Sequence, residues 1–204
     1  MMMKKWGLPA VAALIAALVS LYYYAELPEQ MAIHFGPSDD PDRYASKFVG
    51  AFLLPAIILL VSAVTNLTGK LERDESKRRR FGEVNDTVNI VISFMLLAVH
   101  LMTIAFNLGY DISPSLFAPF LVGVVFIAVG NVLPRAPQGT TKLFRLKEEN
   151  YPRYARFHGR FMVIGGFLII LSTLLPGMLS LYFMFLVIAA LVVSVIGSAA
   201  YFNR

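Results

Sequence analysis

The sequence predicts an all-α integral membrane protein with six transmembrane helices and with both termini in the cytoplasm. Hydrophobic residues make up 57% of its 204 residues and charged residues only 15%, whereas soluble domains carry about 25% charged residues. Long stretches contain no Asp, Glu, Lys or Arg, and the basic residues gather in alternate loops. No cysteine is present, which excludes disulfides, Cys-ligated metals and thiol nucleophiles.

The transmembrane helices are predicted from the stretches without charged residues. A helix needs about 20 mainly apolar residues to cross the hydrocarbon core, and five stretches qualify: 6–25, 48–69, 87–110, 112–134 and 161–203. The last is long enough for two crossings, and Pro176-Gly177 supplies the break between them. We expect the first stretch to be retained, because Tyr22-Tyr23-Tyr24 stands where a signal-peptide cleavage site needs small residues.

The orientation follows from the basic residues of the loops. Besides those near the two termini, Lys and Arg concentrate in a second loop around 70–80 and a fourth loop around 135–160, while the first loop contains only Arg43 and Lys47. Basic residues of short loops stay in the cytoplasm, so the first loop is predicted to be extracytoplasmic. The basic runs also indicate contact with anionic membrane lipids, and no nucleic-acid-binding motif accompanies them, so no direct nucleic-acid partner is expected.

The first loop combines possible ligand atoms with turn-forming residues. Residues 31–35 alternate weakly and could form a short extended piece, and residues 36–42 are rich in Gly, Pro, Ser and Asp. His34, Asp39, Asp40 and Asp42 offer the oxygen and nitrogen atoms that could hold a divalent cation. Their spacing matches no calcium loop, so we expect a solvated turn and no metal.

Inside the predicted spans, His100 is a polar candidate near the middle of the third helix. A lone His in a helix bundle is most often an interhelical hydrogen-bond partner, and no Asp, Glu, Lys or Arg lies in a span to support a carboxylate-type ion pump. Zinc-protease, serine-hydrolase, phosphate-loop and dinucleotide motifs are absent from the sequence. We therefore expect no enzyme and no cofactor.

Two segments of the chain resemble known prokaryotic membrane families. The strings LPEQMAIHF (27–35) and PDRYASK (41–47) resemble the opening pattern of a widespread membrane domain of unknown function, which often precedes an SdpI-like domain. GNVLP (130–134) and RFMVIGG (160–166) resemble two motifs of SdpI-like proteins. The third motif, a core loop with T-P-W, is missing, and only Arg145 remains of it.

The resemblance implies a domain organisation and a function. It divides the chain into a two-helix unit (1–68), a basic cytoplasmic loop (69–86) and an SdpI-like four-helix unit (87–204). It implies immunity to an extracellular peptide toxin, with signalling through a cytoplasmic repressor as a further role. Candidate ligand-facing residues in the first loop are Pro28, His34, Pro41, Asp42 and Lys47, and candidate motif and partner-binding residues are Gly130, Asn131, Pro134, Arg145, Arg153 and Arg160.

Two other functions stay open at this point. A small transporter would use His100 and Asn131 to line a path through the bundle. An accessory protein would bind another membrane subunit through its helices. Neither alternative requires catalytic activity.

Overall fold

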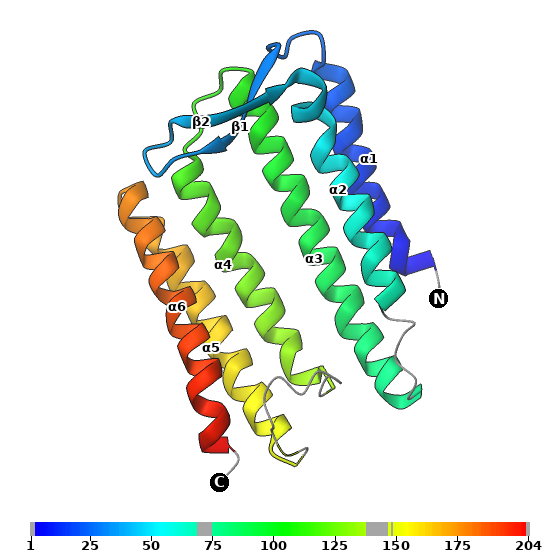
Figure 1. The fold of residues 1–204 in the computed structure, drawn as a ribbon, viewed down its shortest axis with the longest axis vertical. Coiled ribbons are helices and arrows are strands. Elements are labelled where there is room, and N and C mark those ends of the chain that lie inside the picture. The colour runs from blue at the N-terminus through cyan, green and yellow to red at the C-terminus, as the bar shows by residue number, and fades with distance from the viewer. Residues whose placement is uncertain (1–2, 69–74, 138–146, 148, 203–204) are drawn as a thin grey trace. The chain divides into compact units, whose positions relative to one another are not determined.

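Six α-helices and a two-stranded antiparallel sheet form the computed structural model, within the part of the chain that it describes, residues 3–68, 75–137, 147 and 149–202 (Figure 1). In chain order the elements are α1 (Met3–Tyr23), β1 (Gln30–Phe35), β2 (Pro41–Ser46), α2 (Lys47–Thr68), α3 (Glu75–Asn107), α4 (Pro114–Val132), the short 3-10 helix η1 (Leu133–Arg135), α5 (Tyr151–Ser172) and α6 (Gly177–Phe202). Each predicted apolar stretch contains a helix, and the predicted break at Pro176-Gly177 separates α5 from α6.

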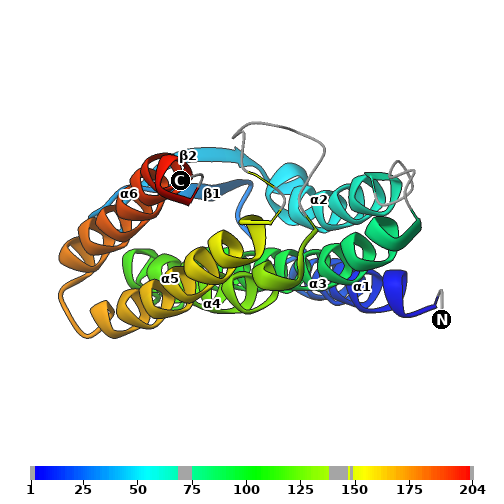
Figure 2. The same ribbon diagram turned by 90° about the horizontal axis from the view of Figure 1, so that it is seen from below.

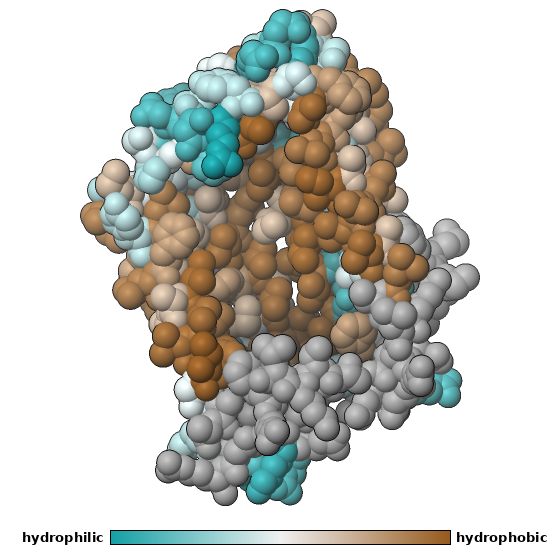
Figure 3. Space-filling view, viewed as in Figure 1, coloured by the Kyte–Doolittle hydropathy of each residue, from teal (hydrophilic) through white to brown (hydrophobic). Residues whose placement is uncertain are grey.

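The helices have the length and surface of membrane spans. Among the described residues, α2, α3, α4, α5 and α6 are long and apolar enough to cross a bilayer, and the apolar part of α1, Gly7–Tyr23, is shorter. Large apolar side chains cover their surfaces, including Leu14 (57% exposed), Leu60 (63%) and Leu186 (65%), and Figure 3 shows a brown surface over the helices. Such a surface suits hydrocarbon. The all-α membrane class is confirmed, while six crossings and cytoplasmic termini stay predictions.

Two helices begin earlier than the apolar stretches predict. α3 begins at Glu75, before the predicted Thr87, and α5 begins at Tyr151, before the predicted Phe161. The prediction of loop structure up to residue 86 and up to Arg160 is therefore wrong. Glu, Lys and Arg are strong helix formers. The absence of charged residues marks the part of a helix that hydrocarbon tolerates, and it does not mark where the helix itself begins.

The first loop forms a β-hairpin, which we call the hairpin (Gln30–Ser46). β1 pairs with β2 from Gln30 opposite Ser46 to Phe35 opposite Pro41, with irregular register around His34. The turn closes through the Gly36 N–H, which donates to the Asp40 carbonyl at 2.9 Å. Figure 1 shows the hairpin at one end of α1, α2 and α3, and Figure 3 shows a hydrophilic surface over it.

The chain divides into two compact units. The first unit comprises Met1–Leu71 and Asn85–Phe117, and the second comprises Glu72–Val84 and Ala118–Arg204. Compactness thus groups most of α3 with α1, α2 and the hairpin. The predicted division of the chain after residues 68 and 86 rests on the resemblance of each segment to a known family, and it stays a prediction.

The first unit packs around small residues of α1. Figures 1 and 2 show α1, α2 and α3 side by side. Ala12 and Ala16 of α1 are fully buried against Ile58 of α2 and Leu97 of α3. Small side chains let helix backbones approach closely, and close approach is a main source of helix association in a bilayer.

The second unit packs through two pairs of glycines where α4 meets α5. A Cβ atom added to Gly123 would lie 2.7 Å from the carbonyl oxygen of Gly166, and one added to Gly130 would lie 2.7 Å from that of Gly159. The glycines are spaced seven residues apart on each helix, so both pairs lie along one line of contact. Only glycine allows the two backbones this separation.

Candidate functional site

His34 and Asp42, predicted to face a ligand, meet across the strands of the hairpin. The His34 Nδ1 lies 2.5 Å from the Asp42 Oδ1, and the two side chains are 56% and 51% exposed. Pro41 begins β2 at the last paired position, where a missing N–H costs the ladder least. Pro28 is exposed in the link between α1 and β1. An exposed imidazole–carboxylate pair can therefore offer both a donor and acceptors to a ligand.

Lys47, also predicted to face a ligand, makes contacts at the base of the hairpin. Its side chain is 14% exposed, its Nζ lies 3.5 Å from Glu29 Oε1, and it sits 5.2 Å from the centre of the Tyr24 ring. Its backbone N–H donates to the Glu29 carbonyl at 2.9 Å. Lys47 is the first residue of α2, so these contacts join the start of α2 to the link between α1 and β1.

Asn107, at the end of α3, holds the first strand. The Ala32 N–H donates to the Asn107 Oδ1 at 2.8 Å, and the Asn107 Nδ2 donates to the Ala32 carbonyl at 2.9 Å. The side-chain amide thus satisfies both backbone groups of one strand residue, as a neighbouring strand would. The adjacent Phe106 ring contacts Phe35 edge to face at 4.5 Å between centroids.

Asp39, in the turn of the hairpin, caps the first turn of α4. Its carboxylate accepts hydrogen bonds from the Ser115 N–H at 2.5 Å, the Ser115 hydroxyl at 2.9 Å and the Ser113 hydroxyl at 2.6 Å. A carboxylate at a helix N-terminus satisfies unpaired N–H groups and favours the positive end of the helix dipole. Asp39 has a φ of 68°, a left-handed conformation that Asp tolerates better than most residues.

Met31 seats the hairpin on α2. The Met31 side chain is fully buried with Leu27, Ala51 and Ile104. A Cβ atom at Gly50 would lie 2.7 Å from the Met31 sulfur and 2.8 Å from its Cβ. Gly50 therefore provides the space into which the strand fits, and the hairpin is held by α2, by α3 and by the first turn of α4.

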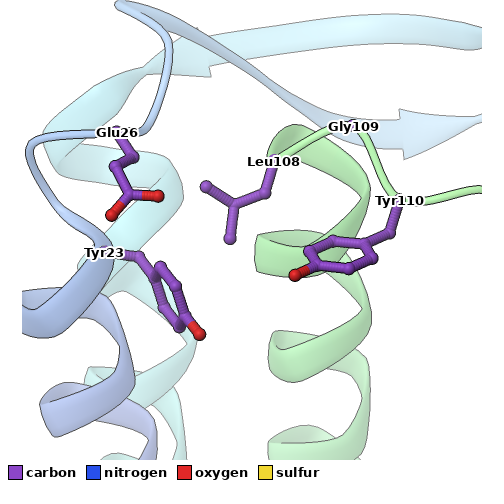
Figure 4. A pocket seen from close by; sticks show the side chains of 5 residues that line it. All are labelled: Tyr23, Glu26, Leu108, Gly109 and Tyr110. Atoms are coloured by element: carbon purple, nitrogen blue, oxygen red, sulfur yellow. The ribbon is translucent and has the colours of Figure 1, made fainter.

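A pocket of about 180 Å³ opens beside the hairpin, in the same unit. Tyr23 and Glu26 line it from the end of α1, and Leu108, Gly109 and Tyr110 line it from the end of α3 (Figure 4). The sequence did not predict that these residues meet, since the ends of α1 and α3 lie far apart in the chain.

The metal alternative for the first loop has no support in the structure. Asp39 binds α4 and Asp40 accepts a hydrogen bond from Ser38 at 2.9 Å, so the carboxylates do not converge with His34. In the described ranges, no group of three or more His, Asp or Glu side chains is placed to hold a metal ion.

His100 lies in the contact between α1 and α3. Its Nε2 is 2.9 Å from Ser20 Oγ and 3.1 Å from the Ala16 carbonyl oxygen, and Ser20 donates its own proton to the Ala51 carbonyl at 2.6 Å. Both neighbours of Nε2 must then accept, so Nε2 carries the proton. His100 Nδ1 and Ser93 Oγ are buried without a partner among the described residues. These contacts support a packing role for His100, and a transport path past it stays a prediction that flux through liposomes with His100→Ala would test.

The residues of the GNVLP segment differ in their surroundings. Gly130 lies in one of the glycine contacts, and Pro134, in η1, contacts the second glycine of that pair, Gly159. Asn131 is exposed. The segment therefore places α4 against the start of α5.

Three arginines form one exposed face at the start of α5. Arg153, Arg156 and Arg160 are all exposed, and their spacing of three and four residues places them along one side of the helix. Arg145 lies outside the described residues. Arg153 and Arg160 thus share a surface, and their binding of a cytoplasmic partner stays a prediction.

His158, on the opposite side of α5 from these arginines, was not singled out in the sequence. It is 2% exposed, its Nε2 lies 2.9 Å from Ser198 Oγ, and its Nδ1 lies 3.4 Å from Ser194 Oγ. The signal in the sequence was a pair of serines four residues apart in the last apolar stretch. The contact ties α5 to α6.

Fold and site together define a polytopic helical membrane protein with a firmly seated hairpin between its first two helices. Residues 11–59, which include the hairpin, match the family described as Domain of unknown function (DUF1648). The chain is 26% identical over 208 residues to "Immunity protein SdpI" of Bacillus subtilis (strain 168), covering 99% of this chain and 98% of that protein. It is 33% identical over 55 residues to "Uncharacterized membrane protein YbgB" of the same organism, covering 27% of this chain and 56% of that protein.

No solved structure matches the chain. The resemblance to the SdpI-like family is confirmed by the similarity over almost the whole length and by the DUF1648 domain. The chain is a multi-pass protein of the prokaryotic cell membrane that is similar to an SdpI immunity protein over almost its whole length.

Proposed function

We propose that this protein confers immunity to an extracellular peptide toxin by binding it at the hairpin, without catalysis. The similarity to "Immunity protein SdpI" spans both chains almost completely, which supports a shared function over a shared fold alone. The observation that carries the binding site is the exposed His34–Asp42 pair on a hairpin with three anchors.

The anchors favour binding because they reduce the conformational entropy that a loop loses when it meets a ligand. The exposed side chains around the hairpin suit a peptide of mixed polarity. Ile33 is 40% exposed, Tyr44 57% and Phe48 66%, and aromatic side chains supply contact area at low entropic cost. His34 and Asp42 add polar contacts that fix the orientation of the peptide.

The signalling role is proposed for the arginine face of α5. Arg153, Arg156 and Arg160 present three guanidinium groups along one side of a helix. Guanidinium groups pair with carboxylates in a planar, two-point geometry. We therefore propose that this face, with Arg145, captures a cytoplasmic repressor through an acidic surface of that repressor.

Survival of a toxin-sensitive host tests the immunity proposal. A Bacillus subtilis strain that lacks its own immunity protein would express this chain and be exposed to the corresponding toxin. Wild-type chain should restore survival, and a variant with both His34→Ala and Asp42→Asn should lose most of the protection at an equal level in the membrane. Asp111→Asn, another exposed carboxylate in a loop of the first unit, is the matched control and should protect fully.

Two outcomes would contradict this proposal. Failure of the wild-type chain to protect would remove the immunity function. Full protection by the double variant would leave immunity in place but move the binding site away from the hairpin.

Repressor capture is tested separately. Cells would express the chain with a fluorescent repressor from the same operon, and recruitment of the repressor to the membrane after toxin exposure would be measured. Arg145→Glu with Arg153→Glu should abolish recruitment and leave insertion and survival intact, whereas Arg135→Glu, at an exposed position in η1 and not on α5, controls for charge reversal. Unchanged recruitment in the double variant would refute the role of the arginine face.

A further inference from the structure

The pocket beside the hairpin has a distinct chemistry. Its lining contains two phenol rings, from Tyr23 and Tyr110, and one carboxylate, from Glu26, and none of its lining side chains is basic. Figure 4 shows the two tyrosines projecting toward each other across the gap, with Glu26 beside Tyr23. Glu26 is exposed and forms no ion pair with the residues that the structure describes.

The backbone adds to the negative character of this pocket, because α1 and α3 both end beside it. The chain leaves α1 with the Glu26 N–H donating to the Tyr23 carbonyl at 2.9 Å. It leaves α3 through Gly109, whose φ is 89°, with the Tyr110 N–H donating to the Ala105 carbonyl at 3.1 Å and the Gly109 N–H to the Phe106 carbonyl at 3.0 Å. The C-terminal end of a helix carries a partial negative charge that favours cations.

The positions of the lining residues are fixed by the fold. The αL conformation at Gly109 is one that glycine adopts without strain, and it turns Tyr110 back toward α1. On the other side, Leu27 directly follows Glu26 and is 3% exposed in the cluster that seats the hairpin. The pocket therefore exists before any ligand binds.

We propose that this pocket binds a positively charged alkylammonium or guanidinium group, carried by the extracellular peptide ligand. This inference rests on the proposed function for the source of the cation, but the chemistry of the pocket stands by itself. Aromatic faces attract cations through their quadrupole, and a carboxylate adds a charge-assisted hydrogen bond. A volume of about 180 Å³ is large enough to admit the cationic head group of one side chain.

Saturation-transfer NMR on the full chain in nanodiscs of phosphatidylglycerol tests the site with small probes. The probes are n-butylammonium, guanidinium and the neutral n-butanol. The cations should show saturation transfer and the alcohol should not. Glu26→Gln should weaken cation binding about tenfold, whereas Asp111→Asn, an exposed carboxylate of the first unit that does not line the pocket, should leave it unchanged.

The tyrosines give a second and independent readout. Tyr110→Phe keeps the ring and should bind the cations with about wild-type affinity, while Tyr110→Leu should weaken them about fivefold, because the attraction arises from the ring. Equal signals for butanol and butylammonium, or equal affinities for Tyr110→Leu and wild type, would overturn the proposal.

A lipid headgroup is the other source of an ammonium group, and two arms distinguish it. Nanodiscs that contain phosphatidylethanolamine should leave butylammonium affinity unchanged if the site serves a peptide, and a strong loss of affinity would assign it to the headgroup. In the survival assay, Glu26→Gln should reduce protection and Asp111→Asn should not. If the wild-type chain binds cations but gives no protection, the proposed function is refuted and the cation site is retained. If the wild-type chain protects but binds no cation in the pocket, the cation site is refuted and the proposed function is retained.

Discussion

Replacing Asp39 tests the contact between the hairpin and α4 most directly. Its carboxylate accepts three hydrogen bonds from Ser113 and Ser115. Loss of a side-chain cap costs about 0.5–2 kcal/mol, and loss of a negative charge at a helix N-terminus costs about 0.3–1 kcal/mol. Asp39→Ala should therefore destabilise the closed hairpin by about 2 kcal/mol before the cost of its backbone conformation is counted.

The backbone conformation separates three substitutions. With a φ of 68° at this position, Ala adds about 1 kcal/mol of strain, Gly adds none, and Asn tolerates the conformation while it removes the charge. The expected order of destabilisation is Ala above Gly above Asn, with Asn near 1 kcal/mol. A different order would show that the hydrogen bonds to α4 are not the main contribution of this residue.

Hydrogen–deuterium exchange in nanodiscs measures the effect, because local opening governs the exchange of the hairpin amides and of the first turn of α4. A loss of about 2 kcal/mol, expected for Gly, corresponds to roughly 30-fold faster exchange, and the additional strain in Ala raises the expected factor to roughly 150-fold. Asp42 lies on the same hairpin and contacts His34, so Asp42→Asn should leave the exchange rates of the first turn of α4 unchanged. Exchange of that turn within threefold of wild type in Asp39→Ala would refute the reasoning.

Three further substitutions test the packing, each with a matched control or a defined readout. Gly130→Val should lower the free energy of unfolding of the detergent-solubilised protein by about 3 kcal/mol, because its Cβ would overlap Gly159. Gly197→Ala, which has no atom within 4 Å of the added Cβ, should not lower it. Equal melting temperatures of the two variants would contradict the glycine contact. Gly50→Ala should cost about 2 kcal/mol through overlap with Met31 and should expose the hairpin to protease, which an unchanged digestion rate would disprove. Asn107→Leu leaves both backbone groups of one strand residue without partners, so β1 amides should exchange about tenfold faster or more, and wild-type exchange would contradict the anchor.

The apolar helices could be predicted from sequence because membrane thickness sets one simple criterion of length and charge. The same criterion missed the starts of α3 and α5, where charged residues extend the helix beyond hydrocarbon. His34 and Asp42 could be chosen from residue type, and the structure brings them together. Their pairing could not be derived, because the register of a short hairpin depends on its turn and on what it packs against.

The contacts that seat the hairpin were not visible in the sequence. Asp39 was expected in a solvated turn and Asn107 was not singled out in the sequence, yet each binds a partner about 75 residues away. Lys47 was predicted to face a ligand, and its contacts with Glu29 and Tyr24 could not be derived from the sequence. Such pairings arise only when separate helices are brought side by side, and no local pattern records them.

The order of synthesis gives these contacts a further meaning. The hairpin is translated before α3 and α4, yet Asn107 and Ser115 belong to those later helices. A nascent chain that ends after α2 has both strands but neither of these partners, and an isolated two-stranded hairpin is marginally stable at best. The hairpin can therefore reach its final form only after α3 and the start of α4 have been synthesised. A correctly folded hairpin thus indicates that the first unit is fully assembled.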